Sequence, residues 1–244
     1  MDSLFIAYLI VCSVGLLAGV LGGIIGFGTT IILMPLLVHF FGPLHAVPIV
    51  ALVAIVANVS RVVMWFKEIN WRVCAVYNLC AVPSVILGAN TLVLLPPRLI
   101  DLVLGGFLLL MIPTRRWLRK IEFKLKLWHM AIVGAVIGYL TGVVASTGAI
   151  NTPFFLAYGL LKGAFIGTEA ASSLIMFIAK GITFQQLGVI NGEILGQGLL
   201  IGAFVLVGSG FSKRFVLKLP EKIFLHLMEA VMLISSLSIL AMAW

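Results

Sequence analysis

Long, nearly uncharged apolar runs recur along the whole chain and constrain its fold more than any other feature. Eight of them are close to the roughly 20 residues that a helix needs to cross the hydrocarbon core of a bilayer. These eight runs are residues 4–26, 46–66, 72–95, 98–114, 128–145, 164–184, 192–210 and 221–243. Because lipid offers no hydrogen-bond partners to the backbone, each run is predicted to be a helix. The expected fold class is therefore an all-α polytopic membrane protein.

The composition excludes a soluble domain of this length. Of the 244 residues, 62% are hydrophobic and only 10% are charged, and the mean hydropathy is +1.24. So few polar side chains cannot cover a globular core in water. The chain begins with Met1, Asp2 and Ser3 and then enters the first apolar run. A signal peptide would carry basic residues there, so the first run is expected to remain as a helix.

The formal net charge of +8 comes from basic residues in short connections between the apolar runs, so nucleic-acid binding is not expected. The densest of these connections, residues 115–127, contains six basic residues. They are Arg115, Arg116, Arg119, Lys120, Lys124 and Lys126. A short loop rich in Lys and Arg stays in the cytoplasm, which predicts that the centre of the chain lies inside. The three cysteines lie in apolar runs without CxxC spacing, so no disulfide framework or zinc site is expected.

The chain repeats itself after about half its length, which indicates two homologous halves. Three glycines recur with a constant shift of 119 positions: Gly15, Gly19 and Gly23 become Gly134, Gly138 and Gly142. In each half, a break rich in small residues and a proline follow these glycines. The predicted organisation is a first membrane repeat at residues 1–114, a basic cytoplasmic linker at 115–127 and a second membrane repeat at 128–244.

Two short apolar runs, residues 29–41 and 149–161, follow the breaks and decide the topology. If both cross the membrane, each half has five segments, and the odd number makes the halves inverted repeats, as in many secondary transporters. If both are re-entrant, each half has four spans and the repeats are parallel. The inverted arrangement puts the basic loops at Lys67 and Lys213 inside, together with the linker, and both termini outside. The sequence therefore favours inverted repeats.

The two breaks are the first candidates for a substrate site. Gly- or Pro-interrupted segments at corresponding places in two repeats expose free backbone groups, and helix N-termini there attract anions. The polar side chains near the breaks are the candidate substrate ligands, and they are Thr29, Thr30, Ser146, Thr147, Asn151 and Thr152. The alternative is that the glycines only allow helices to pack closely.

Charged residues deep in a span are costly and are therefore functional candidates. Arg61 and Lys180 occupy corresponding positions of the two halves, so a pseudo-twofold axis would bring two positive charges to the breaks. Asn58, one turn before Arg61, is a further candidate ligand. The alternative for Arg61 is that its side chain extends to the cytoplasmic interface near Lys67.

Two carboxylates are candidates for proton coupling. Glu169 precedes Lys180 by eleven residues, so the two side chains project from one helix face about 16 Å apart and do not pair directly. Glu169 is predicted to take up and release protons, and a static buried ion pair is the alternative. Glu229 has His226 one turn before it in the last run and is a second candidate. A helix-packing hydrogen bond is the alternative there.

Several of these elements resemble the sulfite exporter TauE/SafE family of membrane transporters, also described as the TSUP family. The resemblance covers nearly the whole chain. In the first half, the family's glycine-rich stretch and the proline after it are matched by Gly19, Gly22, Gly26, Gly28 and Pro35-Leu36. The turn that follows a helix in the family pattern, and the glycine after it, are matched by Ile69-Asn70-Trp71-Arg72 and Gly88. In the second half it rests on Gly167-Thr168-Glu169-Ala170 and Lys180. Thr29 and Thr30 replace later glycines of the family pattern, and Ser146-Thr147-Gly148-Ala149 replaces its second glycine cluster. The resemblance implies transport of sulfite, sulfoacetate or related organosulfonates across a bacterial inner membrane.

An enzyme is not expected, because the sequence contains no HExxH, GxSxG or paired catalytic aspartates, and no GxxxxGK[ST] nucleotide site. Energy for transport must then come from a gradient or a partner. An anion channel and an accessory membrane subunit remain as alternatives. The expected partners are a small anionic substrate and the lipid bilayer. Nucleic acid, a cofactor and a metal are not expected. Assembly into a homo-oligomer stays open.

Overall fold

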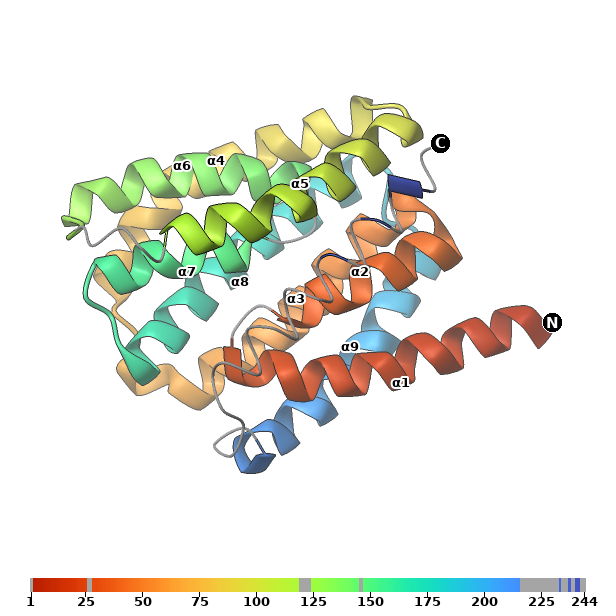
Figure 1. Cartoon of the computed structure of the whole chain (residues 1–244), viewed down its shortest axis with the longest axis horizontal. Coiled ribbons are helices and arrows are strands. Elements are labelled where there is room, and N and C mark those ends of the chain that lie inside the picture. Colours follow the sequence, from red (N-terminus) through yellow and green to blue (C-terminus); the bar gives the residue numbers. More distant parts are fainter. Residues whose placement is uncertain are drawn as a thin grey trace.

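The computed structural model describes residues 2–25, 28–118, 124–144, 147–215 and the separate residues 233, 237, 240 and 241. Among these residues the secondary structure is helical and contains no strand, which confirms the all-α class. The helices of the first part, coloured red to green in Figure 1, are α1 (Asp2–Ile25), α2 (Gly28–Phe41), α3 (Pro43–Trp65), the one-turn 3₁₀ helix η1 (Phe66–Glu68), α4 (Trp71–Leu94) and α5 (Pro97–Leu118). Those that follow are α6 (Leu127–Val143), α7 (Gly148–Ala157), α8 (Lys162–Gln186) and α9 (Gly192–Phe215).

Four helical stretches in the described part of the chain are long and apolar enough to cross a membrane. They are Pro43–Glu68, Trp71–Leu94, Gly163–Gln186 and Gly192–Gly210. The two predicted short runs form separate helices, α2 and α7. The predicted run at residues 221–243 lies outside the described residues, apart from the four separate positions. The molecule is thus a helical protein that crosses the membrane several times.

The ends of several helices follow from the residues at those ends. Gly42 adopts a φ of 76° between α2 and α3, a conformation that favours glycine. Pro43 then begins α3, where its missing N–H costs nothing. Asn70 caps α4 and Asn191 caps α9, since each side-chain oxygen accepts a hydrogen bond from the backbone N–H three residues later, at 3.1 Å and 2.8 Å.

Glycines allow the two most extensive helix contacts, α4 with α6 and α1 with α9. In the α1–α9 contact, Gly19 lies against the backbone of Val205, and in the α4–α6 contact Gly138 lies against the backbone of Ala81. A methyl group at either glycine would collide with the facing backbone, so these positions require small residues. At these two positions the structure confirms close helix packing, the alternative explanation of the glycine pattern.

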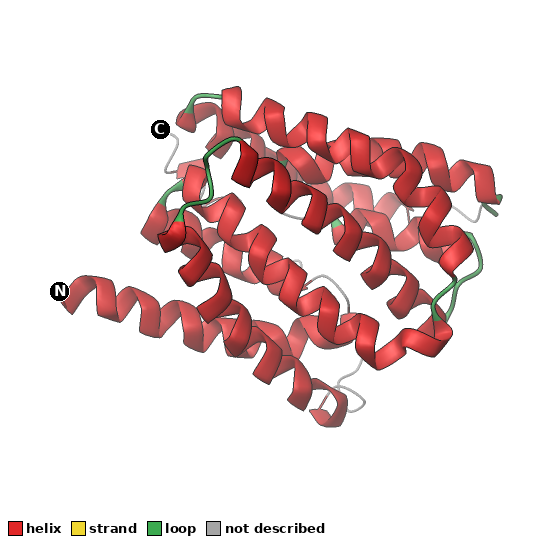
Figure 2. Cartoon of the chain, turned by 180° about the vertical axis from the view of Figure 1, so that it is seen from behind, coloured by secondary structure: helices red, strands yellow, loops and turns green. Residues whose placement is uncertain are grey.

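The helices form layers, with the α4–α6 pair on one side, the α1–α9 pair on the other, and α3 and α8 between them (Figures 1 and 2). When the chain is shifted by 119 positions, α1 falls on α6, α3 on α8 and α4 on α9. Under this shift the α1–α9 contact corresponds to α6–α4, and the α3–α9 contact corresponds to α8–α4. The contact between α3 and α8 corresponds to itself, so these two helices lie at the centre of the arrangement.

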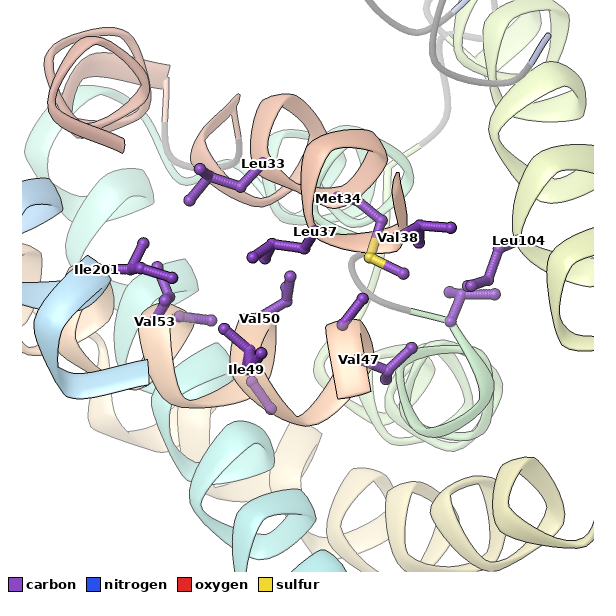
Figure 3. Packing of buried hydrophobic residues seen from close by; sticks show 14 of the residues in the cluster. Leu33, Met34, Leu37, Val38, Val47, Ile49, Val50, Val53, Leu104 and Ile201 are labelled. Atoms are coloured by element: carbon purple, nitrogen blue, oxygen red, sulfur yellow. The ribbon is translucent and has the colours of Figure 1, made fainter. Parts of the chain in front are cut away.

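Helix α2 belongs to the buried core and is not a surface segment. Figure 3 shows Leu33, Met34, Leu37 and Val38 of α2 facing a row of α3 side chains, with α5 and α9 alongside. These four α2 side chains are all at most 2% exposed. The α3 side chains that Figure 3 labels in this core are Val47, Ile49, Val50 and Val53. This packing holds the beginning of α2 beside the middle of α3.

One end of the molecule gathers basic loops that are distant in sequence. The backbone N–H of Asn70 donates to the hydroxyl of Thr168 at 2.9 Å, which joins the start of α4 to the first turns of α8. The linker reaches the same end, because the N–H of Leu125 donates to the carbonyl of Ala157 at 3.0 Å. The exposed basic side chains of these loops are Lys67, Arg72, Lys124 and Lys126. We call this region the basic end.

Candidate functional site

Two helix interruptions border one cavity that is partly open to the outside. Helix α1 ends at Ile25 and α2 begins at Gly28, while α6 ends at Val143 and α7 begins at Gly148. The cavity lies between the N-terminal turns of α2 and α7 and the middle of α3 and α8 (helices in Figure 1). Its polar lining residues are Thr29, Thr30, Asn58, Arg61, Thr141, Thr147, Glu169 and Ser173. Six of these, all except Thr141 and Ser173, were predicted site residues.

The cavity is small and has the dimensions of a compact ion. Measured as the space open to the centre of a water molecule, its volume is about 30 Å³. A single water needs about 10–15 Å³ by this measure. The cavity therefore has room for a group of about the size of two water molecules.

Arg61 and Glu169 form a buried ion pair across the α3–α8 contact. The Nη1 atom of Arg61 lies 3.2 Å from Oε2 of Glu169, and the two residues are 6% and 3% exposed. The Nη2 atom of Arg61 donates to Oδ1 of Asn58, whose own amide donates to the Ala54 carbonyl at 2.8 Å. On the other side, the Ser173 hydroxyl donates to Oε1 of Glu169 at 2.8 Å. Both charges are therefore held in fixed positions at the cavity wall.

This geometry contradicts the alternative in which Arg61 extends to the cytoplasmic interface. Its guanidinium points inward to Glu169, because the buried carboxylate and the Asn58 amide satisfy it there. The partnership itself was missed by the sequence analysis, which considered Glu169 only in relation to Lys180. The sequence contained a signal for this pair, because Arg61 and Glu169 have opposite charges and lie on α3 and α8, which occupy corresponding positions in the two halves.

Lys180 has a different environment from its counterpart Arg61. Its fully buried ammonium donates to the carbonyls of Thr141 and Val144, at 2.5 Å and 2.9 Å, where α6 ends. It also lies 5.4 Å from the centre of the Phe184 ring. A cation at a helix C-terminus satisfies carbonyls that have no partner within the helix. Lys180 therefore braces the α6–α7 interruption and does not line the cavity.

The cavity wall carries both signs of charge, the guanidinium of Arg61 and the carboxylate of Glu169. Arg61 supplies a guanidinium, and the N-terminal turns of α2 and α7 supply partial positive charge. Among the described residues, no group of three or more His, Cys, Asp or Glu side chains lies close enough to hold a metal ion.

Comparison with known proteins identifies the family. The sequence profile described as "Sulfite exporter TauE/SafE" matches residues 11–239 of the chain. The chain belongs to this family. The "Probable membrane transporter protein YjnA" of Bacillus subtilis (strain 168) is similar to it, with 24% identity over 253 residues. That alignment covers 93% of this chain and 97% of the relative. No solved structure matches the chain.

Membership of the TauE/SafE family confirms the resemblance seen in the sequence. The chain is a multi-pass membrane transporter. Membership in a family of membrane transporters also agrees with the expectation that the chain is not an enzyme.

The remaining predicted site residues of this TauE/SafE protein lie away from the cavity or outside the described residues. Asn151 is buried and accepts a hydrogen bond from the Tyr77 hydroxyl at 3.0 Å, and Thr152 donates to the Gly148 carbonyl within α7 at 2.9 Å. Neither lines the cavity. The predicted residues outside the described part are Ser146 and Glu229, together with His226.

Two polar residues of the cavity were not predicted. Ser173 follows Glu169 by one helical turn, so the spacing of four residues could have indicated it. Thr141 donates to the Ile137 carbonyl at 2.7 Å and bonds the Thr147 hydroxyl at 2.5 Å across the interruption. Nothing in the sequence distinguishes Thr141 from other threonines in apolar runs.

Proposed function

We propose that the chain is a secondary transporter of small anions, and that the anion binds in the cavity at Arg61. The observation that supports this most directly is a buried guanidinium between the N-terminal turns of α2 and α7. Both helix ends and the guanidinium favour negative charge, and a charge buried in a span is costly and marks a candidate functional site. The anion replaces Glu169 as the partner of Arg61.

The proposed contacts follow from the hydrogen bonds already present. Asn58 accepts from Arg61 through Oδ1 and donates to the Ala54 carbonyl through Nδ2, so it orients the guanidinium. Thr29 donates to the Ala18 carbonyl at 3.1 Å, and Thr147 is bonded to Thr141, so both hydroxyls shape the wall at the helix interruptions. Thr30 lines the same wall. We assign direct charge recognition to Arg61 and the positioning of the two interruptions to the other residues.

Sulfur oxyanions are the substrate class that we propose. The family is described by sulfite export, and sulfite carries its charge on three oxygens around one sulfur, a compact shape that suits the forked donors of a guanidinium. A cavity of about 30 Å³ favours sulfite over the longer sulfoacetate. We place this transport in the bacterial inner membrane.

We propose that the two halves are inverted repeats of five segments each and that they alternate access to the cavity. The matching helix contacts support this arrangement. The directions of α3 and α8 support it as well: α3 finishes at the basic end with Trp65, whereas its counterpart α8 begins there, with Gly163 against Trp65 and Glu68. Corresponding helices that run in opposite directions are what inverted repeats produce. Basic loops gathered at that end favour a cytoplasmic location for it.

We further propose that Glu169 couples transport to protons. A buried guanidinium left without a partner costs about 3–5 kcal/mol, so Arg61 needs a negative partner throughout the cycle. When Glu169 binds a proton, it stops competing for Arg61, and the substrate anion takes its place. When the anion leaves, Glu169 loses its proton and pairs with Arg61 again. One proton and one anion then move together.

Uptake into proteoliposomes tests the proposal. Purified wild-type protein is expected to take up radiolabelled sulfite in a saturable manner that responds to an imposed pH gradient, and to take up acetate less well. Arg61→Gln is expected to abolish saturable uptake. Arg72→Gln is the matched control, because Arg72 is exposed at the start of α4, and it should transport as the wild type does.

The outcomes separate the alternatives. Saturable uptake with counterflow indicates a transporter, whereas flux that never saturates and shows no counterflow indicates an anion channel. No uptake by well-folded protein would contradict the proposal and favour an accessory role. Unchanged uptake by folded Arg61→Gln would refute the assignment of the cavity.

A further inference from the structure

Three charged side chains are buried among those that the structure describes, and the proposed cycle uses only two of them. Arg61, Glu169 and Lys180 are 6%, 3% and 0% exposed. Arg61 and Glu169 pair with each other at 3.2 Å. In the described part of the chain, the Lys180 ammonium contacts neutral groups, namely two carbonyls and the Phe184 ring. One buried positive charge is therefore left without a negative partner.

Thr141 connects this charge to the cavity. Its carbonyl accepts a hydrogen bond from Nζ of Lys180 at 2.5 Å, and Thr141 itself lines the cavity. Water screens little in such a buried region. At a separation of about 10 Å and an effective dielectric constant of about 20, one unit charge changes the binding constant of a monoanion roughly tenfold. An anion in the cavity therefore feels Lys180 without touching it.

The helix ends around the cavity add little net charge of their own. At each interruption one helix ends and another begins: α1 ends at Ile25 and α2 begins at Gly28, while α6 ends at Val143 and α7 begins at Gly148. A helix N-terminus carries about half a positive unit charge and a C-terminus about half a negative one, so the two ends at each interruption nearly cancel. The buried side chains thus decide the net charge of this region.

The net charge of the three buried side chains depends on the proton of Glu169. While Glu169 is ionised, two positive groups and one negative group leave one positive charge. When Glu169 holds a proton, Arg61 and Lys180 leave two. A buried charge is costly unless an opposite charge compensates it. The protonated site is therefore matched by an anion that carries two negative charges.

Resting on the proposed function, we infer that the cavity takes its anion in a doubly charged form and that Lys180 determines this charge specificity. Arg61 contacts the anion, and Lys180 acts on it from behind Thr141. Sulfite in its fully ionised form belongs to this class of compact dianions. The only covalent change is the proton that Glu169 binds and releases.

The second positive charge matters more for a dianion than for a monoanion. Taking an ion out of water becomes more costly as its charge rises, so a dianion needs more compensation in the cavity. The attraction to Lys180 is also twice as large for a dianion, because it scales with the product of the charges. Removing the charge of Lys180 should therefore weaken the binding of a dianion the most.

Calorimetric titration of the purified full-length protein with sulfate and with methanesulfonate measures this specificity. Both are compact sulfur oxyanions of similar size, with two negative charges and one. At about pH 6, where a lysine amine carries its proton, the wild type is expected to bind sulfate at least as tightly as methanesulfonate. Lys180→Gln should weaken sulfate binding roughly 100-fold and methanesulfonate binding roughly tenfold. A purely structural role would weaken both anions by the same factor.

Lys67→Gln is the matched control, because it removes an exposed positive charge in η1 and should leave both affinities unchanged. Lys180→Arg keeps the charge and should keep the ratio of the two affinities. Lys180→Met, with a side chain of similar length, repeats the test if Lys180→Gln does not fold.

Two results would overturn the inference and leave the anion site standing. One is an equal loss of affinity for both anions in a folded variant that lacks the charge of Lys180. The other is wild-type protein that binds methanesulfonate more tightly than sulfate. If the wild type binds neither anion and takes up no sulfite, the proposed function fails, and the charge specificity fails with it.

Discussion

Replacing Glu169 with glutamine removes the charge that holds Arg61 while it keeps the shape of the side chain. In the wild type, Oε2 lies 3.2 Å from Arg61 and Oε1 accepts from Ser173 at 2.8 Å. The glutamine oxygen can still accept one of these bonds, so the Glu169→Gln protein is expected to fold, with its stability lowered by up to about 3–5 kcal/mol because the buried Arg61 has lost its negative partner. An anion that enters the cavity then has no competing carboxylate at Arg61.

The magnitude follows from the ion pair. A hydrogen bond to a charged group contributes about 1.5–3 kcal/mol, or roughly 10- to 100-fold in a binding constant. Both side chains are buried, so solvent screens the pair little. At about pH 8, Glu169→Gln is therefore expected to bind an anion about 10- to 100-fold more tightly than the wild type.

Calorimetric titration with methanesulfonate measures this directly, since the charge of methanesulfonate does not change between about pH 5 and pH 8. Glu169→Gln should bind methanesulfonate about 10- to 100-fold more tightly than the wild type at the same pH. Glu68→Gln, which changes an exposed carboxylate in η1, should behave as the wild type. Equal or weaker binding by a well-folded Glu169→Gln protein would refute the competition between Glu169 and the anion.

Three further expectations concern stability and topology. Lys180→Met leaves two buried carbonyls unsatisfied at about 1–3 kcal/mol each, so the temperature of thermal unfolding should fall by several degrees, with a smaller effect on anion affinity than Arg61→Gln; an unchanged melting temperature would contradict the brace. Gly138→Val places a side chain against a helix backbone and should lower the yield of folded protein, whereas Gly106→Val meets open space and should not. With the native cysteines removed, Lys67→Cys should react with an impermeant maleimide only in opened cells, and Leu187→Cys should react in intact cells; labelling of both from one side would contradict inverted repeats.

The apolar runs were sufficient to predict helices and membrane location, because the cost of exposing backbone groups to lipid applies to each segment by itself. The breaks could also be located, since glycine and proline interrupt helices wherever they occur. The same reasoning singled out Arg61, Lys180 and Glu169, because a charge in a span is costly whatever its neighbours are. These conclusions needed only local properties of the chain.

The partners of those charges came only from the tertiary structure. Arg61 and Glu169 are 108 positions apart and meet because α3 crosses α8 at the centre of the molecule. Lys180 could equally have faced the cavity by its position in the repeat, but it turns to the carbonyls at the end of α6.

The hydrogen bond between Tyr77 and Asn151 likewise depends on which faces of α4 and α7 meet. Spacing along one helix says which side chains share a face, whereas the packing of several helices decides which faces meet. The sequence alone therefore determined a membrane transporter with a few buried charges. The way its helices cross decided that Arg61 faces the cavity, whereas Lys180 braces the interruption between α6 and α7.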